Sequence, residues 1–340
     1  SRKNSHELSG LLYQSKLYEA PNITAVDPDF DWEQEEEVKY RPMKNGTYKM
    51  TMAIRRLEAE DHFIIDKKYL IKTNVRATLL EENRDQVVFC EAVCHPAIRE
   101  WYDYVVDFLV KRYPMIFHEK SEGVVYNQIR EESFPKKSNS VDDVIDLLSI
   151  LGRNIEDDFV ILLKNEKDEE YILRGGNFLF PAGFNPKKLL GSPLTSIHLP
   201  VPQYTEKLQL AMNKFFNRIN SSQYVVRNNW SIQTHDKIHD LGLNHGKPGQ
   251  DISKIEKLKP EFLDFNKVFL RSERQVLTRL PKTKLVVMSI KTYFTPLIKL
   301  REEENMSEVL CNAIDGLPDD LAIYKNKIKW GEAVKAYMKR

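Results

Sequence analysis

The stretch that decides the fold is LRSERQVLTRLP, residues 270–281, followed closely by VVMSIKTY, residues 286–293. At a period of two residues, one face of the first strand carries Phe269, Arg271, Glu273, Gln275, Leu277 and Arg279. The other face carries Leu270, Ser272, Arg274, Val276 and Thr278. Charge on a buried face is costly unless a polar or anionic group satisfies it, so the first face predicts the floor of a ligand site. In the alternative interpretation this face is solvated, and Arg274 and Val276 point inward.

Length and composition indicate a globular protein with a substantial core. The chain has 340 residues, which suits one large domain or two smaller ones. Hydrophobic residues make up 41% and aromatic residues 10%, which argues against global disorder. The 51 basic and 50 acidic residues nearly cancel, so the overall charge gives no case for binding nucleic acid or an anionic membrane. The longest apolar runs, such as residues 285–288, are too short to span a membrane.

The cysteines and the N-terminus bear on the cellular compartment. Three cysteines, Cys90, Cys94 and Cys311, form no disulfide framework and indicate a reducing environment, so we expect a cytoplasmic protein. No signal peptide is visible. The chain begins at Ser1 without a methionine, which leaves open an upstream anchor or targeting segment.

Residues 1–45 are expected to form an extended arm ahead of a single domain at residues 46–340. The arm is polar and contains Pro21, Pro28 and an acidic run at residues 33–37. Its aromatic residues suggest that it lies against the body; they are Tyr13, Tyr18, Phe30, Trp32 and Tyr40.

Four helices are expected, at residues 96–113, 141–151, 205–219 and 324–338. Pro96 suits the first position of the first helix, and Pro114 ends it. Ser140 is a suitable N-cap for the second helix, with Gly152 at its end.

Five strands are expected, at residues 158–164, 171–180, 225–234, 267–280 and 284–294. Short links at residues 165–169 and 281–283 join the first two and the last two strands, which favours antiparallel pairing. The sequence therefore predicts an α+β fold. It has one antiparallel sheet of five strands with flanking helices, preceded by a helical N-terminal region.

Several cofactor motifs are incomplete. The run from Cys90 to His95 has one residue too many for a c-type haem attachment site. The loop at residues 242–249 contains Gly-Lys but lacks the earlier glycine of a phosphate-binding loop. No glycine-rich dinucleotide turn and no cysteine spacing for an iron–sulfur cluster is present.

Histidines offer two further candidates. His235 and His239 lie four residues apart beside Asp236 and Asp240, so a metal is conceivable there, although the sequence reads as a polar loop. His198 lies in SIHLPVP, residues 196–202, between stiffening prolines, and an imidazole fixed in this way is a workable axial haem ligand. The alternative for His198 is a structural histidine.

Several segments, taken together and in consistent order, resemble the alpha subunit of haem-dependent oxidative N-demethylase and its relatives, particularly the fungal branch. The most specific element is RSERQ at residues 271–275 with RLP at residues 279–281. The other matching segments are residues 48–70, 112–114, 156–158, 179–181, 193–202, 227–232, 291–293 and 324–325. The resemblance covers about residues 40 to 340.

The resemblance implies a PAS-like domain that binds haem b. It also implies an oxygenase that uses O2 to remove a methyl group from a small secondary amine, which is dimethylamine in the characterised bacterial relatives. In those relatives the flavin, the iron–sulfur cluster and the tetrahydrofolate chemistry belong to other subunits. A separate reductase would therefore supply the electrons, in agreement with the missing motifs.

Carried over to this chain, the resemblance makes His198 the proximal iron ligand. The floor of the haem and substrate pocket would consist of Arg271, Glu273, Arg274, Gln275 and Arg279, and its distal wall of Asn228, Asn229 and Trp230. Arginine can fork onto haem propionates. A buried carboxylate such as Glu273 can hold a protonated amine and deliver protons.

Two departures from the family leave room for another substrate. The family commonly reads LRRLP where this chain has LTRLP at residues 277–281, and Tyr-Lys-Gly where it has Tyr324-Lys325-Asn326. A shared fold does not transfer a substrate. A haem-based gas or redox sensor without catalysis and a scaffold without haem are the alternative functions.

Overall fold

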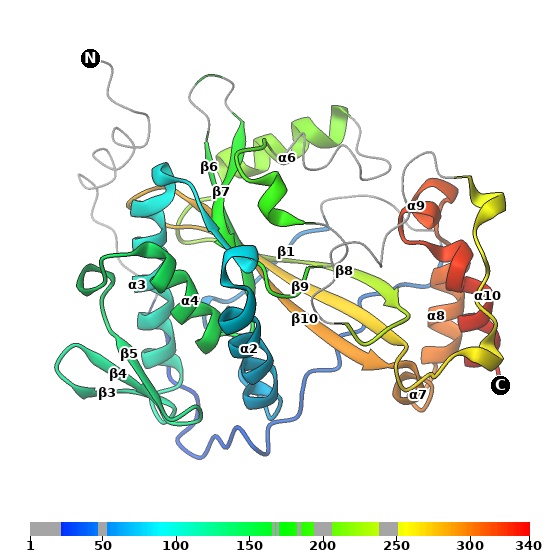
Figure 1. Cartoon of the computed structure of the whole chain (residues 1–340), viewed down its shortest axis with the longest axis horizontal. Helices are drawn as coiled ribbons and strands as arrows, with labels where there is room; N and C mark the ends of the chain where they lie inside the picture. Colours follow the sequence, from blue (N-terminus) through cyan, green and yellow to red (C-terminus); the bar gives the residue numbers. More distant parts are fainter. Residues whose placement is uncertain are drawn as a thin grey trace.

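A central antiparallel sheet of seven strands organises the protein (Figure 1). The computed structural model describes residues 22–46, 53–164, 167, 170–181, 185–193, 206–237 and 251–340. The sheet has the order β1-β8-β9-β10-β6-β7-β2. Its strands are β1 (Arg55–Arg56), β2 (Val88–Cys90), β6 (Asp158–Lys164), β7 (Tyr171–Asn177), β8 (Tyr224–Gln233), β9 (Phe269–Arg279) and β10 (Val286–Pro296).

The five expected strands are confirmed as β6 to β10, and the α+β class is confirmed with them. The expected sheet of five strands is too small, because β1 and β2 extend it at its two edges. These two strands have two and three residues, too few to show any alternation of apolar and polar residues. A second sheet, also unexpected, has the order β3-β4-β5 and is formed by β3 (Phe117–Ser121), β4 (Val124–Asn127) and β5 (Glu132–Pro135).

β9 and β10 form the longest hairpin of the sheet. Their pairing runs from Arg279 opposite Val286 to Phe269 opposite Pro296, with Leu280 N–H donating to Leu285 O across the turn at 3.0 Å. β8 pairs with the other side of β9 from Tyr224 opposite Thr278 onwards. These three long strands fix which side chains share a face.

Helices cover both faces and one end of the sheet. α2 (Tyr69–Val87), α3 (His95–Arg112) and α4 (Val144–Asn154) pack on the back face, with Phe159, Ile161 and Val287 in the same core. α6 (Glu206–Arg218) packs on the front face, where Val160, Leu277 and Ile290 point.

The C-terminal helices gather around one end of β8 and β9, on the right of Figure 1. They are α7 (Leu297–Leu300), α8 (Met306–Asp315), α9 (Asp319–Tyr324) and α10 (Lys327–Met338). Short 3-10 helices lie at Ala59–Asp61, Ala92–Cys94, Ser138–Ser140, Pro186–Leu189, Ile252–Lys254 and Pro260–Phe262. Among the described residues, no helix is long and apolar enough to cross a membrane.

The expected boundaries differ from the structure by more than one residue in two of the four helices. α4 begins at Val144 because the side chain of Asp143, and not that of Ser140, accepts a hydrogen bond from Ile145 N–H; Gly152 lies inside this helix. The expected C-terminal helix is divided at Asn326, whose φ of 62° is left-handed and interrupts the helical hydrogen bonding.

The described part of the N-terminal arm, residues 22–46, lies against the body. Phe30 packs on Tyr113 with ring centroids 5.7 Å apart, and Tyr40 stacks on Tyr293 at 5.1 Å. Ser272 Oγ donates a hydrogen bond to Tyr40 O at 3.0 Å. Tyr13 and Tyr18 fall outside the described residues.

Candidate functional site

Polar side chains meet on the front face where β8, β9 and β10 run side by side. Glu273 pairs directly with Asn229 on one neighbouring strand and with Thr292 on the other. Directly paired residues of antiparallel strands point to the same side of the sheet. The register therefore defines a set that we call the polar face: Arg227, Asn229, Arg271, Glu273, Gln275 and Thr292.

Glu273 is the acidic member of the polar face. Its carboxylate accepts a hydrogen bond from Gln275 Nε2 at 3.0 Å and lies 3.8 Å from Arg271 Nε. The side chain is 14% exposed. The carboxylate is therefore largely desolvated and yet partly open, as a group that binds a ligand must be.

Arg271 is fixed in place beside Glu273. It is almost fully buried and donates to Gln233 Oε1 at 3.2 Å and to Phe180 O at 2.5 Å. Its guanidinium also lies over the ring of Phe294, 5.1 Å from the centroid. Arg271, Glu273 and Gln275 thus lie together, and their catalytic role stays a prediction.

Lys325, the residue that follows α9, extends its side chain to the polar face. Its Nζ donates to Asn229 Oδ1 at 3.3 Å and to the backbone O of Trp230, and it lies 5.2 Å from the centre of the Trp230 ring. Burial lowers the pKa of Lys325 to about 8, and the charge of Glu273 opposes this shift. Sequence reasoning gave Lys325 no role; the resemblance at residues 324–325 was its only signal.

Arg274 points away from the polar face, to the back of the sheet. Its guanidinium donates to His62 O at 3.2 Å and to Asp61 O at 2.5 Å. Asn228 pairs across the strands with Arg274, and Trp230 belongs to the core of the C-terminal helices. The structure therefore does not bring these three expected site residues together with Glu273.

Arg279 lies at the C-terminal end of β9, and its guanidinium holds neighbouring segments of the chain together. It donates to Ile219 O at 2.7 Å, to Lys284 O at 2.9 Å, to Tyr171 Oη at 2.6 Å and to Phe216 O. Arginine at the end of a helix satisfies carbonyl groups that the helix leaves open. Arg279 thus anchors the C-terminal end of α6 to the hairpin of β9 and β10.

His198 falls outside the described residues, as does His239. His62 is buried, and its two ring nitrogens contact Tyr104 Oη at 2.7 Å and Ser289 Oγ at 2.9 Å. Burial and the charge of Arg274 lower the pKa of His62 well below its usual value, so it is neutral. No group of three or more metal-ligating side chains occurs in the part of the chain that the structure describes.

A second polar cluster lies buried behind the sheet, around Glu156, Asp157 and Asp158. Arg76 Nη1 donates to Asp158 Oδ1 at 2.8 Å, and Lys291 Nζ donates to Glu156 Oε2 at 3.1 Å. Buried charges persist only when paired in this way. The cluster ties α2 and β10 to the start of β6.

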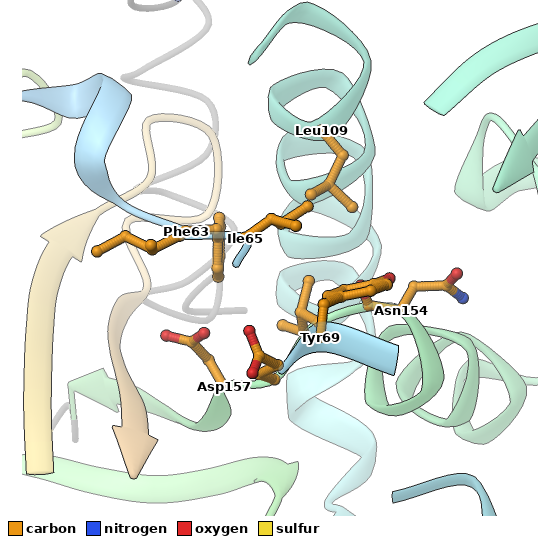
Figure 2. A pocket seen from close by; sticks show the side chains of 9 residues that line it. Phe63, Ile65, Tyr69, Leu109, Asn154 and Asp157 are labelled. Atoms are coloured by element: carbon orange, nitrogen blue, oxygen red, sulfur yellow. The ribbon is translucent and has the colours of Figure 1, made fainter. Parts of the chain in front are cut away.

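A small cavity opens between this cluster and the helices, and Figure 2 shows Tyr69, Leu109, Asn154 and Asp157 around it. The cavity measures about 10 Å³, roughly the room for one water molecule. Among the described residues, no hydrogen-bond partner reaches Asp157 Oδ2. Burial raises the pKa of Asp157 to about 6, although nearby cations oppose the shift. A haem does not fit this cavity, so the polar face is the better candidate site.

The chemistry of the polar face suits the rim of a cofactor with carboxylate groups. Arg227 is a cation that can face a propionate, Arg271 holds Glu273 in place, and Glu273 with Gln275 can bind a polar substrate. The helix α6 covers the apolar part of the same face. Compared with known families, the chain matches the one described as haem-dependent oxidative N-demethylase, alpha subunit-like, over residues 53–335.

Proposed function

The chain belongs to the haem-dependent oxidative N-demethylase, alpha subunit-like family, and from this premise we propose that it is a haem-dependent oxygenase. Its reaction is the O2-dependent removal of a methyl group from a small secondary amine such as dimethylamine. Electrons come from a separate reductase that carries flavin and iron–sulfur groups.

One observation carries the proposal: Glu273 is held by Gln275 and Arg271 on β9, inside the seven-stranded sheet of the described residues and within the family match. A partly desolvated carboxylate can accept a hydrogen bond from the nitrogen of an amine and can exchange protons with it. Gln275 and Arg271 fix its position before substrate arrives, which lowers the cost of ordering the site on binding.

A PAS-like core is supported by the order of the five central strands. In the sheet they lie as β7-β6-β10-β9-β8, which is the order 2-1-5-4-3 of a PAS domain when they are numbered along the chain. The connection from β7 to β8 contains α6, which covers the front face. His198 belongs to this connection in the sequence, which supports it as the residue that would hold the iron of a haem at this site.

Haem b suits this site because the run from Cys90 to His95 lacks the spacing for covalent attachment. When bound, the haem iron supplies the activation of O2, while the protein sets ligation, polarity and access. We assign Arg227 to the propionate side and Glu273, Gln275 and Asn229 to the substrate side, with Arg271 holding Glu273 in place. Arg274, Arg279 and Trp230 support these residues from outside the polar face.

Two measurements test the proposal. The absorption spectrum from roughly 350 to 700 nm, before and after dithionite and carbon monoxide, should show a Soret band that shifts with carbon monoxide. Dimethylamine with a surrogate reductase should then yield formaldehyde and consume O2. A gas-sensitive spectrum without formaldehyde would favour a haem sensor, and a colourless protein that does not take up hemin would favour a scaffold.

A further inference from the structure

Two buried cations flank the carboxylate of the polar face. Arg271 Nε lies 3.8 Å from Glu273 Oε1, and Lys325 Nζ donates to Asn229 Oδ1, the side chain directly opposite Glu273. Arg271 is 1% exposed and Lys325 is 4% exposed, so water and salt screen their charges poorly. Tyr324 beside them stays neutral, because burial raises its pKa to about 12.

Among the described residues around Glu273, positive charges therefore outnumber negative charges. Glu273 offsets one of the two cations, and Arg227 on β8 adds a third in the next position of the face. Thr292 and Gln275, which complete the face, are uncharged. Any substrate that arrives as a cation meets like charges at short range.

A small secondary amine is protonated in neutral water, as is a lysine side chain with its pKa of about 10.4. Nearby like charges disfavour the charged form of such a group. The uncharged amine avoids this repulsion and still donates its N–H to Glu273. It also keeps the nitrogen lone pair, which oxidation of an amine requires and an ammonium ion lacks.

We propose that the polar face binds its amine substrate as the uncharged free base and that Lys325 is the residue that selects this form. This inference rests on the proposed function. The substrate leaves its proton in the solvent on binding, and its N–H then hydrogen-bonds to the Glu273 carboxylate.

Lys325 is the selector, and not Arg271, because of what holds each side chain. The charge of Arg271 is opposed by the Glu273 carboxylate at 3.8 Å, and its guanidinium is held in place by Gln233 and Phe180. Lys325 Nζ has neutral oxygen acceptors, Asn229 Oδ1 and Trp230 O, and no carboxylate of the described residues lies within 4.0 Å of it. Its charge is therefore available to act on the site. Lys325 is a specificity residue that acts through this charge.

The test is the affinity of the hemin-loaded full chain for dimethylamine, measured by calorimetry between about pH 5.5 and pH 7, where Lys325 is mostly charged because its pKa is about 8. The apparent affinity should rise about tenfold per pH unit, following the fraction of free base. The neutral alcohol 2-propanol, which also carries two methyl groups but does not titrate in this range, should bind with the same affinity at every pH. A constant dimethylamine affinity across this range would overturn the inference while leaving the proposed function intact.

Two further outcomes separate the inference about the free base from the proposed function. A low-spin shift of the Soret band that accompanies binding would mean that the amine ligates iron, which overturns the inference. No dimethylamine binding at any pH would overturn the proposed substrate class and the inference with it.

Lys325→Met removes the charge at similar length, and Lys254→Met removes a charge from an exposed side chain as the control. In Lys325→Met, dimethylamine should bind about tenfold more tightly at pH 6 than in the wild type, and the pH dependence should flatten. Lys254→Met should behave as the wild type. An unchanged pH dependence in a folded Lys325→Met protein would overturn the role of Lys325, and if this variant does not fold, the wild-type pH series still decides the inference.

Discussion

Glu273 and Arg274 are neighbours in β9 whose side chains enter different parts of the protein. The carboxylate of Glu273 lies on the front, where Gln275 Nε2 donates to it at 3.0 Å. The guanidinium of Arg274 lies on the back, where it donates to Asp61 O and His62 O. One strand thus supplies the candidate site with its carboxylate and ties the N-terminal segment to the sheet.

Glu273→Gln should abolish most turnover while keeping the haem. The amide has the same shape but cannot exchange protons near neutral pH, and general acid–base groups contribute about 10² to 10⁴ in rate. Formaldehyde release from dimethylamine is the measurement, together with the Soret absorbance per protein. Glu332→Gln, at an exposed position on α10, is the matched control and should keep full activity. Undiminished turnover in Glu273→Gln would remove Glu273 from the mechanism.

His198→Ala should lose haem or change its ligation. An imidazole on the iron defines the ferric and ferrous spectra, so its removal should shift the Soret band or leave the protein without haem. His118→Ala, on β3 in the second sheet, should leave the spectra unchanged. Identical spectra for His198→Ala and the wild type would exclude His198 as the iron ligand.

The strands of the core could be predicted from the sequence because their signals are local. β6 begins and ends at the expected residues, 158 and 164, and its apolar run is buried on both faces. α2 was missed because polar side chains, among them Thr73 and Arg76, lie on its buried side and break the apolar stripe.

The candidate site could be predicted only in part, because its composition depends on contacts between distant segments. The period-two pattern separated Glu273 from Arg274 correctly, and both faces proved to be covered, since Arg274 and Val276 also point inward. No local pattern reveals that Arg274 binds the backbone at residues 61 and 62. Lys325 was also missed, because its role depends on the contact between the end of α9 and β8.

Arg274→Met should destabilise the protein without weakening haem binding much. The carbonyl oxygens of Asp61 and His62 lose a charged donor inside the protein, which costs about 2–4 kcal/mol of unfolding free energy. Urea unfolding measures this loss, and hemin titration should give an affinity within about threefold of the wild type. Arg271→Met is the comparison, because its side chain lies on the polar face. If Arg274→Met lost more hemin affinity than Arg271→Met, this result would indicate that Arg274 belongs to the haem site.

Asp157 should make the stability of the fold depend on pH between about 4 and 6. Burial raises the pKa of this carboxyl from 3.8 to about 6 in the folded protein, so in this range the folded state holds a proton that the unfolded chain releases. The stabilisation by this proton is fully present below pH 3.8 and is lost as the pH rises through about 6. The loss is on the order of 3 kcal/mol.

Asp157→Asn should remove this pH dependence, because the amide fills the same place without titrating. The free energy of unfolding in urea, measured at about pH 4.5 and pH 7, should fall more for the wild type than for the variant. The exposed Asp29→Asn is the control and should follow the wild type. Equal changes with pH in the wild type and in Asp157→Asn would show that Asp157 ionises with its ordinary pKa. In that case the cations around it, Lys291, Arg274 and Arg76, would outweigh its burial beside the cavity of Figure 2.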